Sequence, residues 1–385
     1  MSKADSSDTW LADEVAAGRV DTVALSFADR LGGWRGKRVP ARDFLERGPL
    51  VLGFCDGMIV CDIQCGVIEQ TPFSNYSTGY PDLHVRLDPG DARPMGWRSR
   101  EAFVFGVPSD REGTMLPVAP ISVLTSVIDR LAQRGVMTSA GAELSGAFFD
   151  NERRPVLALS ADGSRNLPWL LLDALVDSWI PVRFSSPGFD PGSFVIGIDP
   201  VSPLELAQSI VVTKGAAKEL ARADGNEAVF MTRRPGGGQP ALLQLDVLVY
   251  GAHSVEPALL AGLLAQVRPL LFPSINAMRQ PVAAPTMLTI AGGTCWRVTA
   301  SAEADTATAL ATVLSAIGAA MEGCVPNGMC IENLAQSALL LEHEWLRDWL
   351  GLSFLENAVP LFEYEASLFS EAITDWEIER YWGTS

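Results

Sequence analysis

The sequence predicts an α+β protein of two domains. Up to about residue 107 it consists of strand-like runs separated by glycine and proline. A Pro/Gly-rich stretch, PSDREGTMLPVAP (108–120), follows. Beyond this stretch helical and strand-like patterns alternate, and such a chain after a small β-rich domain is typical of the α+β class. We therefore expect a leader at 1–17, a small domain at 18–110 and a larger domain at 116–385.

The small domain is expected to contain mostly β-structure. Residues 1–17 predict a loose leader or a short helix. Alternating or β-branched apolar residues predict strands further on. These strands are VALSFAD (23–29), GMIVCDIQ (57–64) and EAFVFGV (101–107).

The larger domain is expected to combine helices with strands. Apolar residues at helical spacing predict helices at 120–135, 167–180, 202–225 and 306–323, and the first has Gly135 as its stop signal. Strand-like runs lie at 142–150, 155–162, 193–199 and 241–250. From about Glu332 onward the pattern is mostly helical.

The composition indicates a globular protein and argues against several functional classes. Hydrophobic residues make up 48% and charged residues 19% of the 385 residues. The net charge is −17 and no Lys/Arg cluster exists, so we expect no nucleic-acid partner and interpret the charge as a source of solubility. No long apolar stretch predicts a membrane span, and the first residues lack the apolar core of a secretory signal. We therefore expect a cytoplasmic protein without a membrane partner.

Cysteine, histidine, glycine and tryptophan patterns do not predict a ligand site. No cysteine forms a CxxC pair; half a metal site at Cys61 and Cys65 is one interpretation, but reduced, partly buried thiols are the favoured one. The Gly236–Gly238 run lacks a following GK[ST], which favours a flexible hairpin loop over a phosphate loop. Surface or core roles are expected for the three scattered histidines and the C-terminal tryptophans: His84, His253, His343, Trp345, Trp349, Trp376 and Trp382.

Five segments carry a resemblance to a known family. They are RGKRVP (35–40), GYPDL (79–83), PLELAQSIVVTK (203–214), VFMTRRP (229–235) and SLFSEAITDWEIERYW (367–382). In their order and spacing they resemble the type I glutamine synthetase family and its γ-glutamylamide ligase relatives. The resemblance covers residues 18–382. It implies a glutamine-synthetase-like fold: an N-terminal β-grasp domain and a larger C-terminal domain of antiparallel sheet and helices.

The resemblance also implies a degenerate active site. In that family glutamates and one histidine hold two divalent metals, which need oxygen ligands, chiefly carboxylates. Here the E-x-E pattern retains Glu143 but has Ser145 at its second position, and the G-Q-x-E pattern ends in Val195. The strand expected to carry H-x-H (241–250) has no histidine, and CWRVTAS (295–301) lacks the glutamate of E-x-R. We expect no catalytic residue and no metal site.

Candidate residues of a vestigial pocket are Glu143, Arg233, Asn276, Arg279 and Arg297. Glu143 is either a former ligand or, as favoured here, a strand residue paired with an arginine. Arg233 stands at the lysine position of FM-x-K-P, and Asn276 and Arg279 correspond to the N-S-Y-K-R segment. Arg279 is then either a substrate-holding arginine or an ordinary ion-pair partner. Arg297 is the only arginine in the shortened region 286–299, where the family has its nucleotide and phosphate arginines.

These implications favour a non-catalytic subunit, a pseudoenzyme of nitrogen metabolism. We expect it to form a homo-oligomer or to assemble with an active γ-glutamyl ligase paralogue, and we expect neither enzymatic activity nor a cofactor in the isolated chain. One alternative is a diverged ATP-dependent γ-glutamyl ligase that joins glutamate to an amine, with ATP and Mg²⁺ or Mn²⁺. The other is a small-molecule sensor in which Arg233, Arg279 and Arg297 bind a carboxylate or phosphate.

Overall fold

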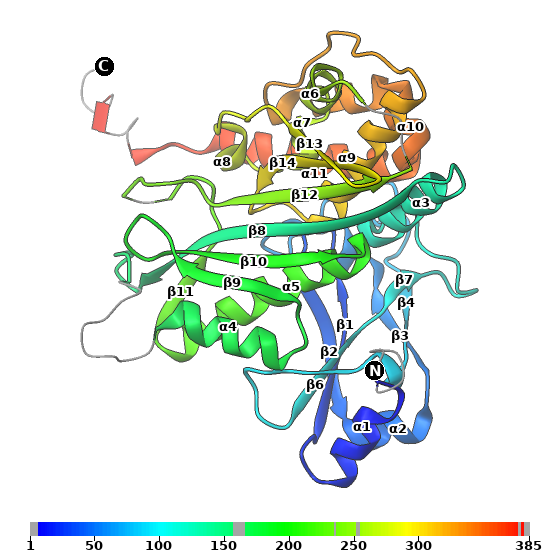
Figure 1. Cartoon of the computed structure of the whole chain (residues 1–385), viewed down its shortest axis with the longest axis vertical. Coiled ribbons are helices and arrows are strands. Elements are labelled where there is room, and N and C mark those ends of the chain that lie inside the picture. The colour runs from blue at the N-terminus through cyan, green and yellow to red at the C-terminus, as the bar shows by residue number, and fades with distance from the viewer. Residues whose placement is uncertain (1–6, 157–165, 235, 252–254, 376–378, 381–385) are drawn as a thin grey trace.

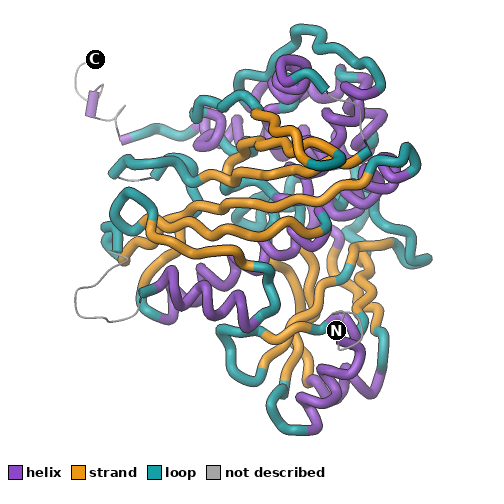
Figure 2. The backbone as a smooth tube through the Cα atoms, in the orientation of Figure 1, coloured by secondary structure: helices purple, strands orange, loops and turns teal. Residues whose placement is uncertain are grey.

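A long twisted sheet crosses the middle of the molecule, and the N-terminal strands gather below it in Figure 1. The computed structural model describes residues 7–156, 166–234, 236–251, 255–375 and 379–380. Helices and strands both contribute throughout, as Figure 2 shows, so the predicted α+β class is confirmed.

The N-terminal part is built from two small sheets. A four-stranded sheet has the order β2-β1-β6-β5, in which β1 and β6 are parallel, and a three-stranded antiparallel sheet has the order β3-β4-β7. The elements are α1 (Ser7–Ala16), β1 (Thr22–Ala28), β2 (Trp34–Pro40), α2 (Ala41–Arg47), β3 (Leu50–Cys55), β4 (Asp82–Leu87), β5 (Arg93–Pro94), β6 (Glu101–Phe105) and β7 (Val107–Ser109). Two short 3₁₀ helices lie at Asp56–Ile59 and Pro89–Asp91.

The predicted strand at 57–64 is wrong. A 3₁₀ turn (Asp56–Ile59) occupies its start, and the chain then continues in turns. Ile59 and Val60 are nevertheless buried in the N-terminal core, so their apolar character serves packing and not strand pairing. The leader contains a helix, α1, whose Leu11 is buried in the same core.

The C-terminal part is organised around one antiparallel sheet of seven strands. Their order is β13-β14-β12-β8-β10-β9, and β11 pairs with β8. The strands are β8 (Met137–Asp150), β9 (Val182–Pro187), β10 (Ser193–Val201), β11 (Asn226–Val229), β12 (Leu242–Tyr250), β13 (Thr286–Ile290) and β14 (Gly293–Ser301). The helices are α3 (Pro120–Ala132), α4 (Leu167–Asp177), α5 (Pro203–Ala223), α6 (Pro257–Ala265), α7 (Arg268–Leu271), α8 (Ile275–Met278), α9 (Thr306–Met321), α10 (Glu344–Leu350) and α11 (Leu352–Glu371), with a 3₁₀ helix at Leu334–Glu342.

Most predicted elements of this part are confirmed. The four helices expected from apolar spacing appear as α3, α4, α5 and α9, each within a few residues of its predicted bounds. Strands at 142–150, 193–199 and 241–250 appear within β8, β10 and β12. The strand predicted at 155–162 falls mostly outside the described residues, as do His253, Trp376 and Trp382. Over the described ranges, no helix is both long enough and apolar enough to cross a bilayer.

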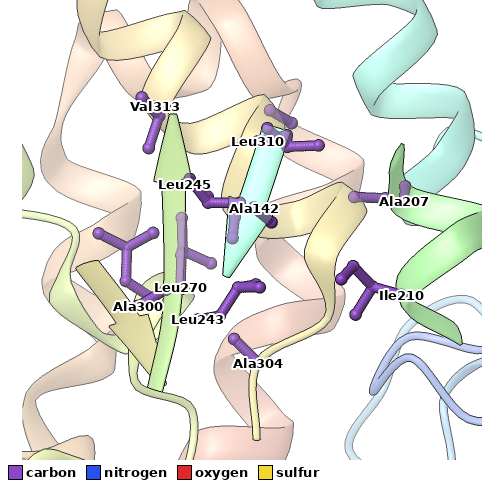
Figure 3. Close-up of a cluster of buried hydrophobic side chains, with 14 of the residues drawn as sticks. Ala142, Ala207, Ile210, Leu243, Leu245, Leu270, Ala300, Ala304, Leu310 and Val313 are labelled. Carbon is purple, nitrogen blue, oxygen red and sulfur yellow. The ribbon is translucent and has the colours of Figure 1, made fainter. Parts of the chain in front are cut away.

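The two faces of the sheet differ because side chains alternate along each strand. On β12 the buried residues Leu243 and Leu245 alternate with the less buried Gln244 and Asp246. Figure 3 shows Leu243 and Leu245 in a cluster with Leu310 of α9. The helix α9 is buried at nearly every position, which explains its lack of a polar face. On the opposite, open face β12 carries Gln244 and Asp246 together with Leu242 and Leu248.

A buried group of charges joins the two parts. The Arg30 guanidinium, in the turn between β1 and β2, stacks on the Phe354 ring and donates a 2.8 Å hydrogen bond to the Phe354 carbonyl. On the other side of this joint, Lys214 of α5 donates to the Ala304 carbonyl at 3.0 Å. Asp305 caps α9 by accepting from the Thr308 N–H. Burial lowers the pKa of Lys214 to about 8 and raises that of Asp305 to about 6.

We predict that Lys214→Met changes the pH dependence of stability. The folded chain releases the Lys214 proton at a pKa of about 8 and the unfolded chain only near the ordinary 10.5, so stability rises with pH between these values. Methionine retains the apolar stem and removes this titration. Urea unfolding of both proteins from pH 7 to 10.5 should show the wild type gaining on the variant as pH rises. A difference that stays constant over this range would contradict the prediction.

Candidate functional site

The open face of the sheet contains Glu143, the residue that the resemblance places in the E-x-E pattern. Glu143 lies on β8, opposite Gly197 of β10 and Gln244 of β12. Its side chain is 27% exposed, so it is accessible from this face. The strands β10, β8, β12 and β14 therefore define the candidate site.

Glu143 is held by arginines. The Nη2 atom of Arg183, on β9, lies 2.9 Å from Glu143 Oε1, and Nη2 of Arg297, on β14, lies 4.0 Å from the same oxygen. Arg183 lies where the pairing of β9 with β10 shifts register, between the pairs Phe184–Gly197 and Val182–Ile198. This register shift lets Arg183 of the edge strand β9 reach past β10 to Glu143 on β8.

Arg297 is held in turn by a second carboxylate. Register places Asp246 of β12 directly opposite Arg297 of β14. Arg297 donates from Nε and Nη2 to the two Asp246 oxygens at 2.7 and 2.8 Å, which is the bidentate geometry that guanidinium groups favour. Hydrogen bonding to Asp246 raises the pKa of Arg297 above its usual range, although partial burial opposes this. Glu143, Arg183, Asp246 and Arg297 thus form an array of two negative and two positive charges, which we call the arginine–carboxylate array.

The other positions that the resemblance matches to metal ligands carry no carboxylate side chain. The Ser145 hydroxyl accepts a hydrogen bond from the Leu242 N–H at 2.8 Å and donates to the Leu242 carbonyl at 3.2 Å. Val195 pairs with Ser145 across β10 and β8 and is apolar. In the described part of the chain, no group of three His, Cys, Asp or Glu residues could hold a metal ion. The residues present do not fit the two divalent cations that the resemblance implies.

Arg233 and Asn276 meet, but through the main chain of Arg233. The Asn276 side chain accepts from the Arg233 N–H at 2.6 Å and donates to the Arg233 carbonyl at 2.7 Å. Glu303 holds the same loop through two further hydrogen bonds: its carboxylate accepts from the Thr232 N–H at 2.7 Å and from the Ser274 hydroxyl. Asn276 therefore positions the loop that follows β11, and the exposed Arg233 side chain has no ion-pair partner among the described residues.

Arg279 lies against the C-terminal helix. Its guanidinium carbon is 4.9 Å from the ring centre of Phe369 on α11, a cation–π contact. Within the described ranges, no hydrogen bond or ion pair links Arg279 or Arg233 to the arginine–carboxylate array. Of the five sequence candidates the structure unites Glu143 with Arg297 and Asn276 with Arg233.

Two residues of the array were not identified from the sequence. Arg183 lies on β9, outside every motif that carries the resemblance, and Asp246 lies in the strand 241–250, where the resemblance implied histidines. The alternation of β12 indicates that Asp246 shares a face with Gln244. Only the register between strands shows that this face also carries Arg297 and Glu143.

No model of a known protein family matches the chain. Curated relatives include the γ-glutamylethanolamide synthetase of Streptomyces coelicolor, 26% identical over 239 residues, and a glutamate–isopropylamine ligase of a Pseudomonas species, 23% identical over 248 residues. Each of these matches covers 57% of this chain, and the chain spans about half, 52%, of each relative's length. A third relative, the type-1 glutamine synthetase 2 of Dictyostelium discoideum, is 22% identical over 99% of this chain and 87% of its own length.

Solved structures share the architecture over nearly the whole chain. GmaS in complex with ADP has a TM-score of 0.76 at 17% identity, covering 96% of this chain and 99% of GmaS. A glutamine synthase homologue also has a TM-score of 0.76, at 18% identity, covering 94% and 97%. The chain is thus a relative of the type I glutamine synthetases and γ-glutamylamide ligases, and it has the glutamine-synthetase-like fold that the sequence predicts.

Proposed function

We propose that this chain is a non-catalytic, pseudoenzyme subunit of the glutamine-synthetase type. The observation that carries this proposal is the state of Glu143. The one carboxylate retained at the former ligand positions is bound to Arg183 and lies beside Arg297. Both contacts go to Oε1, and guanidinium groups this close to the carboxylate repel a divalent cation that approaches it.

The electrostatics of the open face support the same conclusion. A magnesium or manganese ion there would lie beside two positive guanidinium groups and would have to displace Arg297 from its bidentate bond with Asp246. Phosphoryl transfer from ATP depends on metal ions that bridge the phosphates and neutralise the charge developing on them. Without these ions the isolated chain lacks the main means of stabilising that charge, and we derive no catalytic step for it.

We propose that the chain acts through assembly, as a homo-oligomer or in a mixed oligomer with an active γ-glutamyl ligase paralogue. Support comes from the N-terminal part, where the segment 61–80 exposes Ile63 (77%), Val67 (51%) and Tyr76 (83%). Strand β2 is also an unpaired edge of its sheet. Exposed apolar side chains and open sheet edges favour association with another chain.

The alternative is a diverged γ-glutamyl ligase. The names of two relatives, a γ-glutamylethanolamide synthetase and a glutamate–isopropylamine ligase, favour it. Such an enzyme would join glutamate to an amine at the expense of ATP, with Mg²⁺ or Mn²⁺. It would need carboxylate ligands in place of the arginine–carboxylate array.

A direct assay separates these two functions. We expect the purified chain, given ATP, glutamate, Mg²⁺ or Mn²⁺ and either ethanolamine or isopropylamine, to release no phosphate and form no γ-glutamyl product above background. The Streptomyces coelicolor relative in the same assay is the positive control. Glutamate-dependent phosphate release that disappears in Glu143→Ala would establish the ligase instead.

A charge reversal tests the role of the array. We expect the wild-type chain to show no saturable Mn²⁺ binding by calorimetry or electron paramagnetic resonance. The double variant Arg183→Glu/Arg297→Glu places four carboxylates on the open face and should gain a Mn²⁺ site, since hard cations bind clustered carboxylates. The matched variant Arg183→Gln/Arg297→Gln removes the positive charges without adding ligands and should bind more weakly. Two Mn²⁺ ions bound to the wild type in a Glu143-dependent way would overturn the proposal.

Oligomeric state tests the assembly role. Light scattering on the full chain should show a ring-like oligomer, either alone or after mixing with the paralogue. Ile63→Ser/Val67→Ser should reduce assembly if segment 61–80 forms the contact, whereas Phe189→Ser, at a fully exposed residue elsewhere, serves as the control. A well-behaved monomer under both conditions would exclude an assembly role.

A further inference from the structure

Two of the six cysteines lie in a tight turn after β3. The Asp62 N–H donates to the Gly66 carbonyl at 3.0 Å, and the Cys65 N–H donates to the Asp62 carbonyl at 3.0 Å. The Asp62 carboxylate also accepts from the Gln64 and Gly66 N–H groups. Cys65 has φ = 65°, which a non-glycine residue adopts rarely and at some energetic cost. The turn folds the chain back so that both sulfur atoms reach the same neighbour.

That neighbour is the Arg35 guanidinium on β2. Its Nη1 atom lies 3.1 Å from Cys65 Sγ, and its Nη2 atom lies 3.9 Å from Cys61 Sγ. Its Nε atom donates to Asp29 Oδ2 at 2.7 Å, and Asp29 is itself fixed by the Leu31 and Gly33 N–H groups. The guanidinium is therefore held in place with two N–H groups directed at sulfur.

A cation that donates a hydrogen bond to sulfur stabilises the thiolate, which is the nucleophilic form of cysteine. Cys65 is exposed and has such a cation, whereas Cys61 is 8% exposed. We propose that Cys65 is a reactive thiol and a site of oxidative modification, and that Cys61 is its resolving partner in a reversible Cys61–Cys65 disulfide. The guanidinium beside both sulfur atoms also argues against a metal half-site, since it places a positive charge close to both candidate ligands.

The chemistry balances with a low-molecular-weight disulfide, such as glutathione disulfide, as oxidant. The Cys65 thiolate attacks one sulfur of the oxidant, its S–S bond breaks, and one glutathione leaves as a thiolate. The Cys61 thiol gives up its proton to solvent and attacks the Cys65 sulfur, which releases the second glutathione. Two protein thiols are oxidised by two electrons and two glutathione thiols form. Burial raises the pKa of Cys61 to about 11, against the opposing effect of Arg35, so the second step is expected to be the slower one at neutral pH.

Labelling rates test the reactivity of Cys65. Limited treatment of the folded chain with iodoacetamide at pH 7, read by peptide mass spectrometry, compares Cys65 with Cys55 and Cys330. These two are also exposed, and neither has a described contact with an arginine. We expect Cys65 to react several-fold faster than either, because a guanidinium N–H is directed at its sulfur atom. In Arg35→Met the rate should fall to that of Cys330, and in Arg35→Lys it should remain partly raised.

Equal rates for Cys65 and Cys330 in the folded wild type would overturn the proposal. This comparison stands even if Arg35→Met fails to fold, because it needs no variant.

Peptide mapping tests the disulfide. Cleavage before aspartate, at Asp56, Asp62 and Asp82, places Cys55, Cys61 and Cys65 on three separate peptides. After treatment with glutathione disulfide, the unreduced digest should contain Cys61 and Cys65 peptides linked to each other. Cys61→Ser should stop at a glutathione adduct on Cys65. A lasting adduct on Cys65 in the wild type, or a link from Cys65 to Cys55, would reject Cys61 as the resolving thiol.

Discussion

The alternation of side chains along β8, β12 and β14 decides what each residue of the central sheet can do. Leu243 and Leu245 must face the helix α9, because the buried core lies there. Asp246, between Leu245 and the buried Val247, then has to face the open side. A slip of one residue in β12 would bury Asp246 without a partner and expose the leucines, so burial of one face strongly fixes the register. This register brings Asp246 opposite Arg297.

The open face is balanced in charge by this arrangement. Each ion pair of the arginine–carboxylate array is partly exposed to solvent, so it contributes about 0–1 kcal/mol to stability, and the array is not needed to hold the fold together. The array affects cation binding more than stability, because its two guanidinium groups pair with two carboxylates that would otherwise attract a cation. The pairing of Asp246 with Arg297 has a further consequence for the sensor interpretation. Arg297 already donates to Asp246 from Nε and Nη2, so few of its N–H groups remain for an anionic ligand.

Local patterns in the sequence were enough to predict most elements. Helix α5, for example, was predicted from its apolar spacing. In the structure its start is fixed by the Ser202 hydroxyl, which accepts from the Glu205 N–H, and by a proline at the first helical position. The strand predicted at 57–64 was wrong because an apolar run indicates burial and does not distinguish a strand from an irregular buried segment. At the site, Glu143 and Arg297 were found through their place in family motifs. Arg183 was not, because its contact depends on an irregularity in strand pairing that no local pattern records.

The turn between β1 and β2 connects two regions that otherwise look independent. Asp29 accepts hydrogen bonds from the Leu31 and Gly33 N–H groups and from Arg35 Nε. The same turn carries Arg30, which is buried against Phe354 at the joint with the C-terminal part. Arg35 is the residue whose other nitrogen atoms contact the sulfur atoms of Cys61 and Cys65. Whatever displaces Arg35 therefore removes an ion pair from the carboxylate that shapes the turn. The exposed Cys65 thiol is therefore linked to the buried contact of Arg30 with Phe354 through Arg35, Asp29 and the turn between β1 and β2.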